Sequence, residues 1–215
     1  MKFSIQHYFE FLSLLVSLLC LKKLKNSFMI FFVPYLLLIL EIEILAKYLH
    51  VTYALSTGWM YNILNLISHF FFAFIFYMFS TAKEHRQTII LLTATYIISS
   101  LTYYFYTSFA FNNYIIAYGG IIQVIFACIH FYEYLLHDYY VKEKHYSAGL
   151  FIAAGVLIFY SGITICLSLY NYILLNQLMI FNTPLYNIIP RYLSIILYSC
   201  ISIALIVWRK PMTTS

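Results

Sequence analysis

The sequence predicts an all-α membrane protein, folded as a bundle of seven transmembrane helices. Its 215 residues include 12 Lys and Arg and 7 Asp and Glu, so charged residues make up 9% of the chain, against roughly 25% in soluble domains. Hydrophobic residues make up 64%, and the mean hydropathy is +0.87. Because a soluble fold of this size cannot bury so much apolar surface, the composition excludes a disordered chain, a nucleic-acid-binding protein and a soluble enzyme.

Seven apolar runs are long enough to cross the hydrocarbon core, which takes roughly 20 residues in a helix. The runs are continuous, unlike the ten-residue alternating segments of a transmembrane barrel. Backbone groups in lipid must be hydrogen-bonded within their own segment, so each run predicts a helix. The expected spans are residues 3–21, 28–49, 59–81, 88–106, 114–136, 148–170 and 188–208. They make residues 1–215 one transmembrane domain with short connections.

The first span contains Glu10 and could be taken for a secretory signal. Its amino-terminal flank holds only Lys2, whereas Lys22 and Lys23 follow it. A secretory signal has the opposite order of charge and ends in a cleavage site of small residues. We therefore expect a retained helix.

Basic residues gather in every second connection. All Lys and Arg residues except Lys2, Lys47 and Arg191 follow the first, third and fifth spans or open the carboxyl tail. With seven spans these places share one side of the membrane, and the positive side faces the cytoplasm. This predicts an outer amino terminus, a cytoplasmic carboxyl terminus and a location in the cell (inner) membrane. These basic connections also account for the net charge of +5, so no nucleic-acid partner is needed to explain it. The partner that we expect is the lipid bilayer around the spans.

The ionisable residues within the spans are the first candidates for function, because each costs about 2.5–3.5 kcal/mol at a helix centre. The second span contains Glu41, Glu43 and Lys47. Glu43 and Lys47 are four residues apart and can pair along their own helix. Glu41 has no such neighbour, and it points about 200° away from Glu43. It therefore needs a partner from another helix.

The third span offers that partner. Asn62, Asn65 and His69 share one face of the helix. At 1.5 Å per residue, Asn65 and His69 lie about 9 and 15 Å below the outer end, on either side of the depth of Glu41 at about 12 Å. A Glu41–Asn65–His69 network is geometrically possible. It is either a set of hydrogen bonds that fixes helix packing or the wall of a ligand site.

The sixth and seventh spans add polar groups in the outer half. Thr164 lies on a face with other hydroxyl and amide side chains, which can also bond to carbonyls of their own helix. Arg191 lies about 4–5 Å inside the outer end, where its side chain can reach the interface. The predicted ligand-binding set is Glu41, Asn62, Asn65, His69, Thr164 and Arg191.

The fifth span carries a second polar stripe at its cytoplasmic end, formed by His130, Glu133 and His137. The spacing could hold a divalent metal on one helix face, but it is no established motif. We interpret it as a polar edge at the interface, and a pH-dependent switch is a further option. The four cysteines are widely spaced within spans, so we expect no disulfide framework, metal site or cofactor.

Four segments carry a resemblance to a family. They are residues 59–65 (WMYNILN), 130–136 (HFYEYLL), 155–162 (GVLIFYSG) and 208–210 (WRK). Together they resemble a group of small seven-helix integral membrane proteins of Bacteroidota, whose members often accompany signalling proteins. The resemblance implies a sensory or accessory role and brings no catalytic residues. The last span excludes retinal proteins, since it has no lysine, and the zinc amidases of seven helices, since it has no histidine.

The predicted function is therefore a sensory or accessory subunit, with an outward-facing polar pocket coupled to a cytoplasmic signalling protein. The partner is needed because the spans leave little room for a soluble domain. A small channel or transporter subunit is an alternative that requires a polar path linking the two clusters. An intramembrane lipid-modifying enzyme is another, with Glu41 and His69, or the stripe, as acid and base.

Overall fold

The computed structural model describes residues 4–107, 113–136, 144–180 and 183–209. Within them, seven helices are long and apolar enough to cross a membrane, which confirms the predicted all-α architecture and number of spans. These helices are α1 (Ile5–Leu24), α2 (Phe32–Tyr53, after a 3-10 turn at Phe28–Phe31), α3 (Gly58–Phe79), α4 (Lys83–Thr107), α5 (Asn113–Leu136), α6 (Lys144–Ser168) and α8 (Leu185–Arg209). The short elements between α6 and α8 are α7 (Tyr170–Leu175) and the antiparallel strands β1 (Met179–Ile180) and β2 (Thr183–Pro184).

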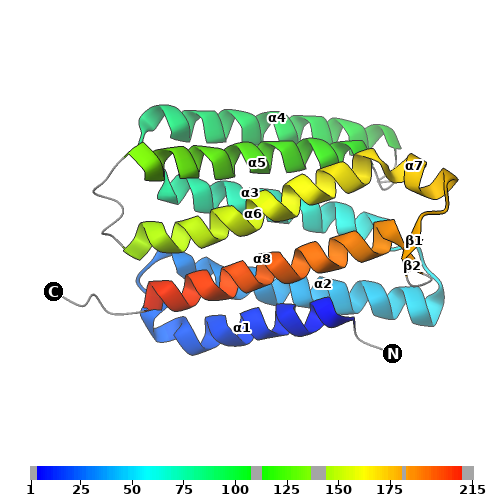
Figure 1. Cartoon of the computed structure of the whole chain (residues 1–215), viewed down its shortest axis with the longest axis horizontal. Helices are drawn as coiled ribbons and strands as arrows, with labels where there is room; N and C mark the ends of the chain where they lie inside the picture. The colour runs from blue at the N-terminus through cyan, green and yellow to red at the C-terminus, as the bar shows by residue number, and fades with distance from the viewer. Residues whose placement is uncertain (1–3, 108–112, 137–143, 181–182, 210–215) are drawn as a thin grey trace.

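The seven long helices lie side by side with their axes roughly aligned (Figure 1). The closest packing joins α6 to α8 and to α5, and α1 packs against α8 and α2. Helix α3 contacts α2, α4 and α5. This arrangement leaves α1 and α2 on one flank of the bundle and α4 on the other (Figure 1).

The two ends of the bundle differ in charge. Lys22 and Lys23 lie in the last turn of α1, and Lys83 and Arg86 lie in the first turn of α4, at the end that also holds the carboxyl terminus (Figure 1). We call this the basic end. The opposite end holds the start of α1, the α2–α3 corner, α7 and the two short strands, and we call it the amino-terminal end. The basic connections that the sequence predicts on one side lie together at the basic end. Which end faces the cytoplasm stays a prediction.

Local sequence explains several boundaries. Pro34 sits in the first turn of α2, where its missing N–H is not needed. Helix α2 ends where Ala54 adopts a left-handed conformation with φ 53°. Helix α8 begins at Leu185, earlier than predicted, so Pro190 lies inside it rather than in its first turn.

Candidate functional site

Three ionisable side chains meet between α1 and α2 near the amino-terminal end. His7 and Glu10 are one turn apart, so both lie on the same face of α1, toward α2. The His7 Nδ1 atom lies 3.2 Å from Glu10 Oε2 and 4.0 Å from Glu43 Oε2. The side chains are 8%, 2% and 15% exposed, in that order. We call His7, Glu10 and Glu43 the carboxylate–histidine cluster.

Groups from four helices surround this cluster. Gln6 hydrogen-bonds the Glu43 side chain, and Lys47, one turn further along α2, interacts electrostatically with it. Tyr61 of α3 interacts electrostatically with both carboxyl groups of the cluster. So does Tyr198 of α8, which is buried. The interior at this level is therefore polar.

Hydrogen bonds tie the same part of α1 to α8. Ser13 Oγ donates to the Tyr198 carbonyl oxygen at 2.8 Å and lies 2.9 Å from Ser202 Oγ. Ser13 is completely buried. A displacement of α1 at the carboxylate–histidine cluster would therefore also displace α8 through these hydrogen bonds.

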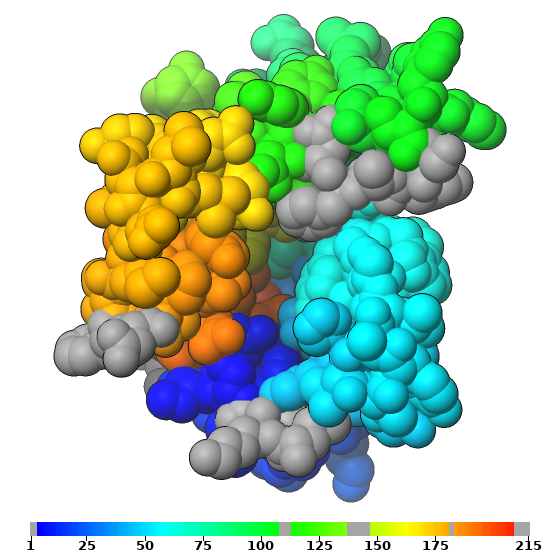
Figure 2. Space-filling view, turned by 90° about the vertical axis from the view of Figure 1, so that its right-hand side faces the viewer, coloured from blue at the N-terminus to red at the C-terminus, as the bar shows by residue number. Residues whose placement is uncertain are grey.

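The amino-terminal end is hollowed in its middle. Figure 2 looks onto this end and shows a recess between the α2–α3 corner on one side and the start of α8 on the other, with the first turns of α1 below. The elements that border the recess are those that supply the polar groups around the cluster. The recess lies at the end of the bundle near which the carboxylate–histidine cluster is found (Figure 2).

The residues of the predicted ligand-binding set are placed differently. Glu41 and Arg191 are exposed, and Asn65 is half-buried. Asn62 is completely buried in α3. Thr164 is half-buried and donates to the Ala117 carbonyl oxygen of α5 at 3.4 Å. The described contacts do not gather these side chains into one pocket, and a ligand-binding role for them stays a prediction.

His69 lies in an aromatic environment away from Glu41. Its ring stacks on Tyr96 of α4 with ring centroids 3.9 Å apart. Its backbone carbonyl accepts a hydrogen bond from Gln123 Nε2 of α5 at 3.1 Å. Its side chain is 2% exposed, whereas Glu41 is on the outer surface of α2, so the structure does not bring this acid and this base together.

At the basic end, the carboxylate of Glu133 in α5 accepts hydrogen bonds from the residues just before α4. Its carboxylate accepts hydrogen bonds from Ser80 Oγ at 2.7 Å, from the Thr81 N–H at 3.1 Å and from the Ala82 N–H at 3.4 Å. His85 Nδ1 lies 2.5 Å from the same carboxylate. An acceptor at a helix amino terminus satisfies N–H groups that have no partner within the helix. Glu133 is thus a buried connection between α5 and the α3–α4 turn rather than a polar edge.

The other members of that stripe do not join Glu133 in one site. His130 is buried, with its ring centroid 5.1 Å from that of Phe79, and it packs against Gly149 of α6. His137 lies outside the described residues. The core of the bundle is apolar between the level of His130 and the level of the carboxylate–histidine cluster. Phe72, Phe76 and Phe126 are fully buried in this layer. Within the described core, this apolar layer gives no support to a polar path along the bundle.

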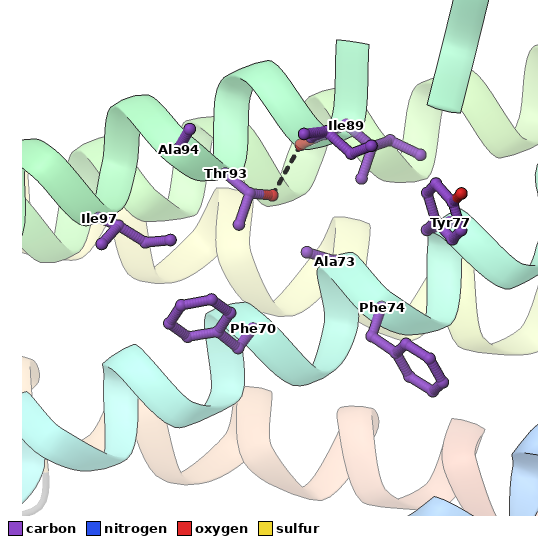
Figure 3. Close-up of a pocket in the computed structure, with 9 residues that line it drawn as sticks. Phe70, Ala73, Phe74, Tyr77, Ile89, Thr93, Ala94 and Ile97 are labelled. Atoms are coloured by element: carbon purple, nitrogen blue, oxygen red, sulfur yellow. Dashed lines mark hydrogen bonds between the residues drawn. The ribbon is translucent and has the colours of Figure 1, made fainter. Parts of the chain in front are cut away.

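A groove between α3 and α4 is apolar (Figure 3). Phe70, Phe74 and Ile90 line it and are partly exposed, so it opens on the outer surface of the bundle, where lipid lies. Its Thr93 hydroxyl donates to the Ile89 carbonyl oxygen at 2.7 Å and is used within its own helix (Figure 3). The groove therefore suits an acyl chain, and its polar side-chain groups are the hydroxyls of Tyr77 and Thr93.

Comparisons of the chain with models of protein families, with curated proteins and with solved structures give no match. The resemblance to the Bacteroidota group therefore stays a prediction. What is established is a multi-pass membrane protein with seven membrane-length helices in the described residues.

Sequence reasoning missed the carboxylate–histidine cluster. It considered Glu10 and Glu43 one at a time and did not use His7. The signal was present, because His7 and Glu10 are an i, i+3 pair of metal-ligating residue types inside an apolar span.

Proposed function

We propose that this multi-pass membrane protein is a sensory or accessory subunit that binds a small ligand in a polar pocket at its amino-terminal end. The observation that supports this most strongly is the convergence of His7, Glu10 and Glu43 inside the bundle. Ionisable groups within a membrane are expensive and usually mark a functional site. The recess at the same end of the bundle is consistent with a site that opens there (Figure 2).

The proposed output is a shift of helices at the basic end. Helices α1 and α8 are joined by Ser13, Tyr198 and Ser202, and both run from the pocket to the basic end. A ligand that draws α1 toward α2 would therefore bias the position of α8. The basic connections would present this change to an acidic surface of a cytoplasmic partner.

The other two functions receive less support. A channel needs a polar path, and the layer of Phe72, Phe76 and Phe126 lies across it. An enzyme of the predicted kind needs Glu41 beside His69, and these side chains lie apart.

Thiol labelling of intact cells tests the pocket and its sidedness together. We expect Tyr61→Cys to react with a membrane-impermeant, positively charged methanethiosulfonate, because Tyr61 is half-buried beside the cluster. Ile75→Cys, in the fully buried part of the same helix, should not react. Asn26→Cys, exposed at the basic end, should react only after the membrane is permeabilised. A Tyr61→Cys variant as inert as Ile75→Cys would refute the pocket, and reaction of Asn26→Cys in intact cells would refute the orientation.

Site-specific photo-crosslinking tests the partner. A photoreactive residue at Lys23, which is exposed at the basic end, should give a discrete protein adduct in the organism's own membranes. The same residue at Leu55, which is exposed in the α2–α3 corner, is the matched control and should not give that adduct. Equal adducts at both positions, or none at Lys23, would contradict an accessory role at this end.

A further inference from the structure

We infer that His7, Glu10 and Glu43 form a binding site for a divalent transition-metal cation, with Zn²⁺ as the best fit. The inference rests on the proposed function and deepens it, because it assigns the class of ligand that the pocket takes. It concerns residues of α1 and α2 that the sequence did not connect.

The spacing of the donor atoms suits one small cation. One ligand atom from each of His7, Glu10 and Glu43 lies within 4.8 Å of those of the other two. Ligand bonds of about 2.0–2.2 Å place neighbouring donors about 3.3–3.6 Å apart around a tetrahedral zinc ion. The pair on α1 is at 3.2 Å already, and Glu43 is 4.0 Å from His7. Glu43 would have to move toward the pair on α1 to complete the set.

The types of donor narrow the class of metal. One imidazole nitrogen with two carboxylate oxygens is a borderline set that suits Zn²⁺ and related transition metals better than Ca²⁺ or Mg²⁺, which prefer oxygen ligands alone. Three protein ligands leave a fourth position for water, as in zinc sites that exchange ligands. A Glu and a His three residues apart on one helix also bind metals inside helix bundles, although there in the order Glu-x-x-His, the reverse of the order in α1.

The surrounding side chains fit a second layer of support. Gln6 hydrogen-bonds Glu43, and Tyr61 and Tyr198 interact electrostatically with both carboxyl groups. An amide donor such as that of Gln6 can orient a ligating carboxylate. The ligands come from α1 and α2, so binding of a cation would link these two helices.

The balance of charge also favours a cation. Two carboxylates in a largely buried site repel each other unless positive charge lies between or beside them, or one of them takes up a proton. Among the described residues, Lys47 interacts electrostatically with Glu43, and Tyr61 and Tyr198 interact electrostatically with both carboxyl groups of the cluster. A divalent cation neutralises both carboxylates at once. The competing arrangement is an ionic lock without metal, in which protonated His7 and Lys47 supply the positive charge.

The test is metal binding by the full chain, purified in nanodiscs after treatment with a chelator. We expect one Zn²⁺ per chain by isothermal titration. Glu10→Gln and Glu43→Gln should each weaken binding by about 100-fold or more, since even outer-layer partners of a metal contribute 10–100-fold. Glu84→Gln is the control, because it removes the same charge from an exposed position in the first turn of α4, outside the cluster, and binding should be unchanged.

Two further measurements make the test decisive. Co²⁺ in place of Zn²⁺ should show the absorption of nitrogen and oxygen ligation, and a thiolate spectrum would assign the metal to a cysteine and overturn the site. Size-exclusion profiles of the Gln variants should match wild type, so that loss of binding is not loss of fold. Folded chain that binds no Zn²⁺, or binds it equally in Glu43→Gln, overturns the metal site. If Tyr61→Cys is still labelled from outside, the pocket survives that result, so the two failures are distinguishable.

Discussion

Replacing Glu133 by alanine is expected to lower the free energy of unfolding by about 3 kcal/mol. The carboxylate accepts hydrogen bonds from Ser80, Thr81 and Ala82 and contacts His85. Without it, the part-buried N–H groups of Thr81 and Ala82 lose their acceptor and the buried Ser80 hydroxyl loses its partner, and a buried unsatisfied donor costs about 1–3 kcal/mol. Because the bonds join α5 to the α3–α4 turn, the loss should concentrate at the basic end.

Unfolding in lipid–detergent micelles with increasing sodium dodecyl sulfate measures this change. Glu84→Ala is the control, since Glu84 is exposed in the first turn of α4, and its effect should stay within about 0.5 kcal/mol. Glu133→Gln should fall between the two, because its amide keeps one acceptor oxygen and turns donors toward the remaining N–H groups. Equal effects of Glu133→Ala and Glu84→Ala would show that the carboxylate does not hold α4.

Glu133 also shows what the sequence can and cannot predict. Its apolar surroundings along the chain predict a helix, and its spacing from His130 predicts a shared face. Its partners lie in the α3–α4 turn, far away in sequence, and nothing local indicates that this turn folds back onto α5. Apolar runs predict spans because the bilayer acts on each segment alone, whereas partners depend on how the segments pack.

The two acidic residues of α2 make the same point. The sequence favoured Glu41 because it has no local partner, and it assigned Glu43 to Lys47. In the structure Glu41 is exposed, and Glu43 faces α1 and contacts His7. Helix α2 is apolar on all sides, so its pattern cannot indicate which face is inside a bundle and which faces lipid. Packing against α1 determines which face of α2 points into the bundle.

The contact between α6 and α8 depends on Gly155, and we expect Gly155→Ala to lower the free energy of unfolding by about 2–3 kcal/mol. The added Cβ would lie 2.7 Å from the Cβ of Cys200. A Cβ is fixed to its backbone, so the strain is relieved by separating the two helices and not by a rotamer change. Gly162→Ala is the comparison in the same helix. Its Cβ would meet the terminal methyl groups of Leu193, which can move, so its effect should stay below about 1 kcal/mol.

Second-site variants identify the cause. Cys200→Gly removes the opposing Cβ and should recover about 1–2 kcal/mol when it is combined with Gly155→Ala, as a positive coupling in a double-mutant cycle. Cys200→Ala keeps that Cβ and should recover little. Equal recovery by both would place the strain at the Cys200 sulfur, 3.4 Å away, and not at the backbone.

Because α8 holds α1 through Ser13 and Tyr198, separation of α6 from α8 should also displace His7 and Glu10. Gly155→Ala should therefore weaken Zn²⁺ binding although it touches no ligand, and Cys200→Gly should restore it.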